Sequence, residues 1–420
     1  MMHFVIMPED YFNNFIQSHQ TSNMYQSVEY GRLMATRGFE TEYIGVVDGT
    51  KTILCAALIL TKTITKNIRF CYIPGGPIID YEHTALLAFF IEKVKKYTDQ
   101  KKASFLKIDP AIPMFEHDIN GAKIGEKNNL QVVHFLESLG ATHLGFNNYF
   151  ETINPRWTAF LEGITNKLEL PHQKNPLATY KINRASEKGI NIYLGNYQYL
   201  NEFYELIKNN YEFYEFNYYQ NIYNNFGDKF NFYFAILDPN ILSDNARALY
   251  EMELGVNNNL NEQLLHSSPD EREFLLNEKM ESDKKIVIYK TDINDSIALV
   301  QKYPKGLKIG AVGIIKHNDT IYFIADGSLN KFKKFYPKDL LYAKIIEEFQ
   351  RQGYTKFNFN AVAGVFDASN PYSKLNEFKN QFANKIIEQP GEFDFVINQL
   401  NYFKLTSSQD YKNLIKKQAK

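Results

Sequence analysis

Cysteine is scarce in this chain of 420 residues, which contains only Cys55 and Cys71. Both lie in apolar stretches that we expect to be strands. We therefore predict reduced, buried thiols, with a single disulfide as the alternative. Reduced thiols are typical of a cytoplasmic protein.

Long hydrophobic runs are also missing. The longest, ILCAALIL at 53–60, has eight residues, whereas a helix needs about 20 to cross a bilayer. The N-terminal stretch MMHFVIMPEDYFNNF has no basic segment followed by a sustained apolar core, so it does not predict a signal peptide. We expect no transmembrane segment.

The chain has no excess of either charge, because 47 Lys and Arg face 48 Asp and Glu, a net charge of −1. This balance excludes a bulk polyanion binder, so any contact with nucleic acid must be local. The nine histidines show no metal-ligand spacing such as H-E-x-x-H. A glycine-rich pyrophosphate loop, which an acetyl-CoA enzyme would need, is absent too; RQGYTK near 351 is too short and follows a helix.

Hydrophobic residues make up 44% of the chain and charged residues 23%, which is typical of a folded protein. Hydrophobic periodicity predicts two α/β halves, each with a hairpin, at Asp48-Gly49 and at Asn318-Asp319. In the first half we expect helices at 9–18, 25–37, 85–102 and 129–139, and strands at 43–47, 51–63, 68–74, 103–110 and 143–151. In the second half we expect strands at 188–195, 232–237 and 356–360, a hairpin over 308–328, and helices at 199–211, 218–226 and 337–352.

Residues 245–285 have apolar positions about three and four residues apart. The stretch SSPDER contains a turn, after which Pro269 marks the start of a helix. This pattern predicts an antiparallel helical hairpin. The predicted fold class is therefore α/β, with two tandem acetyltransferase-like (GNAT-like) subdomains and an inserted helical arm. The expected boundaries are 1–148 for the first subdomain, 149–240 and 304–405 for the two parts of the second, 241–303 for the arm and 406–420 for a basic helical tail.

The stretch CYIPGGPIIDYEH, residues 71–83, contains a rigid corner. Pro74 and Pro77 fix φ, whereas Gly75 and Gly76 permit conformations and close approaches that a Cβ would block. One interpretation is an ordinary turn that ends a strand. The other is that a ligand passes against bare backbone.

Several segments together resemble the FemABX family of peptidoglycan aminoacyltransferases over nearly the whole chain. In chain order they are FETEYIGVVDG, YIPGGPIIDYEH, FLKIDPAIP, LESLGATHLGF, YFIADGSLNKF, YTKFNFNAVAGVF, NEFKNQF and PGEFDFVINQLNYF. Eight ordered segments are more specific than any one of them.

The resemblance implies transfer of glycine, alanine or serine from aminoacyl-tRNA to the amine of the peptidoglycan stem peptide or of a growing bridge on lipid II. It implies no cofactor and no metal, a place at the inner face of the plasma membrane, and a possible homo- or hetero-dimer with a family paralogue. The alternative is a weakly active or inactive member that acts as the binding partner of an active paralogue.

Two residues match the family's catalytic positions. Asp109, in KIDP, matches a carboxylate placed near the accepting amine, where it could hold an ammonium. Lys379, in NEFKNQF, matches a lysine that stabilises the tetrahedral intermediate. The ordinary alternatives are a turn-forming Asp before Pro110 and a solvated surface lysine. We expect the two groups to converge across one groove.

The resemblance also suggests substrate-binding positions, namely Gly75, Gly76, Pro77, Asp80, Tyr81, Arg32, Tyr214 and Phe378. Three family cations are missing here, at Met34, Gly75 and Tyr214, although Arg32 and Arg37 flank the first. A family motif rich in arginine is only partly present: NPLATYKINRASEKG contains Lys181, Arg184 and Lys188 but lacks the doubled arginine. Aromatic residues expected near the cleft are Phe332, Phe335 and Tyr336, and expected tRNA contacts are Lys284, Lys285, Lys331, Lys333 and Lys334.

Overall fold

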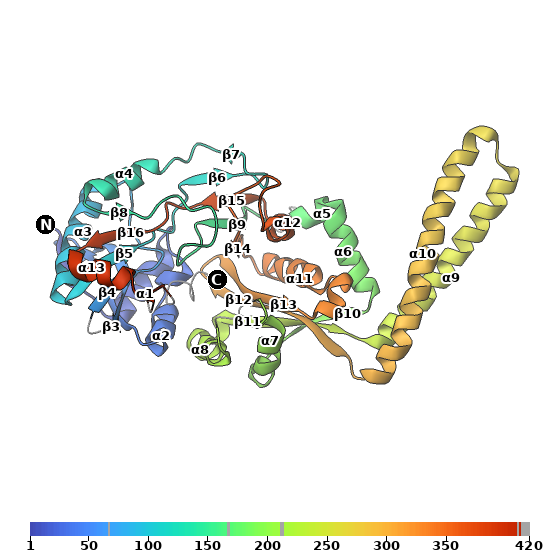
Figure 1. The fold of residues 1–420 in the computed structure, drawn as a ribbon, viewed down its shortest axis with the longest axis horizontal. Coiled ribbons are helices and arrows are strands. Elements are labelled where there is room, and N and C mark those ends of the chain that lie inside the picture. The colour runs from blue at the N-terminus through green and yellow to red at the C-terminus, as the bar shows by residue number, and fades with distance from the viewer. Residues whose placement is uncertain (66–67, 166–168, 211–213, 410, 413–420) are drawn as a thin grey trace.

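The computed structural model describes residues 1–65, 68–165, 169–210, 214–409 and 411–412. Two mixed sheets with their helices lie side by side, and a long pair of helices projects from the second (Figure 1). We call the first sheet with its helices the first half and the second sheet with its helices the second half.

The first sheet has seven strands in the order β1-β2-β3-β4-β5-β16-β8. Their bounds are His3–Ile6, Glu40–Val47, Ile53–Thr65, Ile68–Ile73, Ala103–Ile108, Phe393–Val396 and Thr142–His143. All neighbours are antiparallel except β4 and β5, which are joined by helix α3 (Thr84–Gln100). The predicted β2–β3 hairpin forms at Asp48, whose carboxylate accepts hydrogen bonds from the amides of Thr50 and Thr52.

Helices cover the first sheet because their apolar residues recur on one face. The remaining ones are α1 (Glu9–Ser18), α2 (Val28–Thr36), α4 (Leu130–Ser138) and α13 (Gln399–Thr406), with a 3-10 turn at Met24–Gln26. On α3, Leu87, Phe90, Ile91 and Val94 are buried in the core of this half.

The second sheet has nine strands in the order β10-β11-β12-β13-β14-β9-β15-β6-β7. Their bounds are Ile190–Leu194, Phe230–Leu237, Leu307–His317, Thr320–Ser328, Lys356–Ala361, Trp157–Glu162, Lys385–Glu388, Phe115–His117 and Lys123–Ile124. Its helices are α5 (Pro171–Lys174), α6 (Pro176–Glu187), α7 (Leu200–Ile207), α8 (Phe216–Phe226), α11 (Pro337–Arg351) and α12 (Ser373–Asn380), with 3-10 turns at Tyr197–Tyr199, Gly227–Lys229 and Asn330–Phe335.

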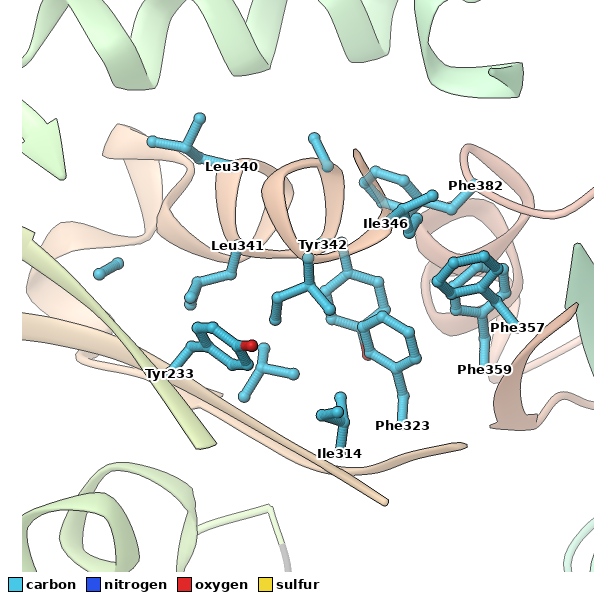
Figure 2. Packing of buried hydrophobic residues seen from close by; sticks show 14 of the residues in the cluster. Tyr233, Ile314, Phe323, Leu340, Leu341, Tyr342, Ile346, Phe357, Phe359 and Phe382 are labelled. Atoms are coloured by element: carbon cyan, nitrogen blue, oxygen red, sulfur yellow. The ribbon is translucent and has the colours of Figure 1, made fainter. Parts of the chain in front are cut away.

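The two halves share one topology. In each, a four-stranded antiparallel meander is followed by a helix and a strand that pairs in parallel with the last meander strand: β4, α3, β5 in the first half and β13, α11, β14 in the second. Figure 2 shows Leu341 and Tyr342 of α11 extending toward Ile314 and Phe323 of the sheet. This agrees with the predicted pair of α/β halves.

The halves also exchange strands. Segment 115–124 adds β6 and β7 to the second sheet, and β16, from near the C-terminus, returns to the first. Lys107 on β5 lies opposite Asp394 on β16 and binds it at 2.8 Å, with Glu392 at 3.0 Å, all fully buried. Each sheet therefore contains strands from within the other expected subdomain, because strand pairing over such distances leaves no local signal.

The arm consists of α9 (Pro239–His266) and α10 (Pro269–Lys302), packed antiparallel (Figure 1). Its base is fixed by Asp292, which binds Lys188 and, at 2.5 Å, Arg184 of α6. The pair occupies the place that the apolar spacing predicts, and its span of 239–302 extends beyond the stretch 245–285 at both ends, close to the expected arm boundaries of 241–303.

Other local predictions had mixed outcomes. Cys55 and Cys71 are free and buried, as predicted. No helix among the described residues is long and apolar enough to span a bilayer. The strand expected at 143–151 is wrong: β8 ends at His143, and Gly145 then adopts a left-handed φ of +95° that breaks the extended path. Most of the predicted basic tail, residues 413–420, lies outside the described part of the chain.

Candidate active site

A cavity of about 770 Å³ lies between the two halves. The first half contributes the segment from Met24 to Arg37, and the second contributes α8, β13, β14, α11 and α12. Many of its lining residues are aromatic, among them Tyr25, Tyr30, Tyr214, Tyr218, Phe323, Tyr342, Tyr372 and Phe378. Its described charged lining residues are Arg37, Lys333, Lys338, Lys374, Lys379 and Asp326, so cations outnumber carboxylates.

Lys379 lies near the end of α12 and lines this cavity with only 7% of its surface exposed. Its Nζ donates a hydrogen bond of 2.5 Å to the carbonyl oxygen of Ala361. Burial lowers the pKa of Lys379 to about 7, with Lys338 adding to the decrease and Asp326 opposing it. Near neutral pH this amine can therefore give or take a proton.

The groups around Lys379 form a compact network. Asp326 on β13 holds Lys338 Nζ at 2.6 Å and accepts a hydrogen bond of 2.7 Å from the Tyr342 hydroxyl. Burial alone would raise the pKa of Asp326, but Lys338 and these hydrogen bonds outweigh it and lower the pKa. Lys338 Nζ also lies 4.5 Å from the centre of the ring of Phe378, one of the expected substrate-binding residues, which lines the cavity.

Sequence reasoning missed Asp326 and Lys338. The signal was present in ADGS and in FYPK, but nothing in the spacing of these two stretches connects them with Lys379.

Asp109 does not line the cavity. It is 5% exposed at the end of β5, and its carboxylate accepts hydrogen bonds from Tyr72 Oη (2.7 Å), Gly75 N (2.6 Å) and Asn154 Nδ2 (2.8 Å). Burial, helped by the charge of Glu392, raises the pKa of Asp109 to about 7 despite these hydrogen bonds. Asn154 does line the cavity, so Asp109 and Lys379 approach the same space, but Asp109 does so through Asn154.

The glycine corner also differs from the expectation, because Gly75, Gly76 and Pro77 are buried and do not line the cavity. A Cβ on Gly75 would lie 2.6 Å from Asn23 Oδ1, and one on Gly76 would lie 2.8 Å from Gln26 Cδ. The bare backbone thus makes room for the chain's own 3-10 turn, whose Tyr25 faces the cavity.

Three other expected contacts lie away from the cavity. Asp80 is exposed and caps the amide of Glu82, and the buried Tyr81 hydroxyl donates to Pro77 O. Arg32 is exposed and pairs with Glu9, because its position on α2 faces outward.

Arg37, just beyond α2, points into the cavity instead. Its guanidinium lies 5.7 Å from the centre of the Tyr214 ring and 5.5 Å from that of Tyr218, and these two rings are stacked at 4.1 Å. Tyr214 lines the cavity, and a cation lies beside it although Met34 itself is buried in the core.

Of the lysines expected to contact tRNA, Lys333 lines the cavity. Lys331 and Lys334 are exposed on the same 3-10 turn. On the arm, Lys284 pairs with Glu281 at 2.6 Å, and Lys285 lies 3.8 Å from Glu253.

The remaining expected residues lie outside the main cavity. Phe332 and Phe335 are buried in the core. Tyr336, Arg184 and Lys188 line a second cavity of about 260 Å³ at the base of the arm. Lys181 contacts Gln381 at 3.1 Å.

Taken together, two topologically equivalent mixed α/β units that enclose one cavity with a buried lysine are characteristic of a transferase built from paired acyltransferase folds. The family model for the FemAB family matches residues 7–408, so the chain belongs to the FemAB family. This confirms the predicted resemblance, and membership makes the chain an acyltransferase.

The relatives agree with this assignment. The chain is 23% identical over 424 residues to "Aminoacyltransferase FemA" of Staphylococcus aureus, covering 99% of this chain and 100% of that one. It is 22% identical to the protein of the same name from Staphylococcus epidermidis, covering 96% and 97%. The solved structure "Crystal structure of FemX" superposes with a TM-score of 0.74 at 20% identity, covering 96% of this chain and 99% of that one, which supports the fold.

Proposed function

We propose that this protein transfers an amino acid, glycine, alanine or serine, from aminoacyl-tRNA to an amine of the peptidoglycan stem peptide or growing bridge on lipid II. The observation that carries this proposal is Lys379, a buried amine in a cavity between the halves, in a chain whose full-length relatives are named aminoacyltransferases.

The reaction needs little from the protein beyond positioning and electrostatics. The neutral amine nitrogen attacks the ester carbonyl carbon, the bond from that carbon to the ribose oxygen breaks, and the proton lost by the nitrogen ends on the ribose oxygen. As an ammonium, Lys379 would stabilise the oxyanion of the tetrahedral intermediate. With a pKa of about 7 it can also pass the proton to the leaving oxygen.

The rest of the cavity suits large anionic substrates. Arg37 is half-buried, and no carboxylate among the described residues pairs with it. We infer that it binds a phosphate of the precursor and takes over from the cations missing at Met34 and Tyr214. Lys333 and Lys374 would contact the end of the tRNA, which predicts binding that weakens as salt increases.

The acceptor substrate would also determine where in the cell the protein acts. Lipid II is anchored by its lipid, so we propose that the protein acts peripherally at the inner face of the membrane.

The decisive experiment is transfer of labelled amino acid from each charged tRNA to lipid II and to lipid II with one bridge residue. We expect transfer by the wild type and a loss of about a hundredfold or more in Lys379→Met. Lys404→Met, an exposed lysine in the last turn of α13, is the matched control and should retain activity.

No transfer from any charged tRNA, beside an active FemA as positive control, would contradict the proposal. Tight binding to a paralogue together with an unchanged bridge composition in Lys379→Met cells would instead favour the non-catalytic partner role.

A further inference from the structure

Asn154 connects the buried Asp109 with the cavity. It lies in the loop between β8 and β9, is half-buried, and lines the cavity together with Ile153 and Pro155. Because its side-chain amide has one donor end and one acceptor end, the orientation of that amide decides what it offers to a substrate.

The hydrogen bonds fix this orientation. Asn154 contacts Asp109 Oδ2 at 2.8 Å and Tyr72 Oη at 3.0 Å, both through Nδ2. Above its pKa of about 7 the Asp109 carboxylate is ionised and can only accept, and the Tyr72 hydroxyl already donates its hydrogen to Asp109 Oδ2 at 2.7 Å. Both partners therefore require the NH₂ group, and the carbonyl oxygen Oδ1 is left for the cavity.

No donor among the described residues hydrogen bonds to Asn154 Oδ1. Among the charged groups of the cavity wall, Arg37, Lys338 and Lys379 are cations or donors, and Asp326 is occupied by Lys338 and Tyr342.

We propose that Asn154 Oδ1 accepts a hydrogen bond from the attacking amine of the substrate, and that Asp109 is the positioning residue that keeps this oxygen turned toward the cavity. This inference rests on the proposed function, since it assigns the acceptor-amine subsite of the same reaction.

An amide suits this role better than a carboxylate. A carboxylate beside the amine would favour its protonated form, which has no lone pair and cannot attack. A neutral carbonyl oxygen orients one N–H and leaves the lone pair free for the ester carbon. The negative charge of Asp109 stays one hydrogen bond further away.

The test compares two soluble probes, a peptidoglycan stem peptide with a free side-chain amine and the same peptide with that amine replaced by hydrogen. Their dissociation constants are measured by calorimetry. We expect the wild type to bind the amine peptide about tenfold or more tightly, as for one hydrogen bond to a charged or strongly polar donor. Asn154→Ala should bind the two peptides equally and lose a similar factor in kcat/KM for the acceptor.

Two further variants distinguish an effect of the orientation of the Asn154 amide from a general structural effect. Tyr72→Phe leaves the bond between Asn154 Nδ2 and Asp109 in place and should retain the preference. Asp109→Asn removes the partner that can only accept, so Asn154 can turn and the preference should fall. Asn294→Ala, exposed on α10, is the neutral control.

An unchanged preference in Asn154→Ala or in Asp109→Asn would overturn the inference, and if Asn154→Ala does not fold, the Asp109→Asn result decides. If the wild type transfers no amino acid but shows an amine preference that depends on Asn154, the proposed function fails and the amine subsite stands. If it transfers amino acid and the preference survives the loss of Asn154, only the subsite fails.

Discussion

Replacing Lys379 by methionine should stabilise the protein while it lowers transfer by about a hundredfold or more. The buried lysine has a pKa of about 7 in the folded protein, against 10.5 as its ordinary value. The folded state thus holds this proton less tightly than the unfolded chain, so the wild type gains stability as pH rises from about 7 to about 10.5 and loses it as pH falls. Methionine has a similar length and no proton to lose.

The magnitude follows from that difference. At about 1.36 kcal/mol per pKa unit, burying the charged lysine costs roughly 4 kcal/mol at pH 7 and roughly 2 kcal/mol at pH 9. Methionine also loses the hydrogen bond to Ala361 O, worth about 1 kcal/mol. We therefore expect Lys379→Met to be more stable than wild type by about 3 kcal/mol at pH 7 and by about 1 kcal/mol at pH 9.

The assay is urea unfolding at several pH values between 6 and 9, followed by fluorescence and by circular dichroism. Lys404→Met should differ from the wild type by less than about 0.5 kcal/mol at every pH. A Lys379→Met protein that is less stable than wild type at pH 7, or whose advantage does not shrink with rising pH, would refute the reasoning.

Three other substitutions test a buried ion-pair cluster, the glycine corner and the cavity. Lys107→Met leaves two buried carboxylates without their cation and should cost about 3–5 kcal/mol in urea unfolding, whereas neutralising those carboxylates as well should recover most of the loss. Gly75→Ala forces a side chain into φ +60° with an oxygen 2.6 Å away and should lower stability by about 2 kcal/mol or more, while Gly49→Ala, with open space around it, should be nearly neutral in thermal unfolding. Arg37→Gln should raise KM for lipid II about tenfold and flatten its salt dependence, and Arg32→Gln should do neither; equal effects would contradict the assignment of the phosphate contact.

Much of the secondary structure could be predicted because its causes are local. The Asp48 turn, the apolar face of α3 and the Pro269 start of α10 depend on residues a few positions apart. Loop 144–151 could not be predicted, because its sequence alternates like a strand and only the left-handed Gly145 breaks it.

The residues of the candidate site also fall into those that the sequence could identify and those that it could not. The sequence identified Lys379, Phe378 and Tyr214, which line the cavity. It could not identify Asp326, Lys338 and Asn154, since these acquire their roles only from neighbours far along the chain.

The amino-acid sequence by itself determined the two α/β halves, the arm, the buried thiols and the need for residues without a Cβ at 75 and 76. The tertiary structure decided what fills the space above those glycines, which of two nearby arginines reaches the cavity, and that Asp109 is buried behind Asn154. The reason is physical: periodicity and turn chemistry act over a few residues, whereas burial, hydrogen-bond direction and pKa depend on which distant strands and helices come to lie together.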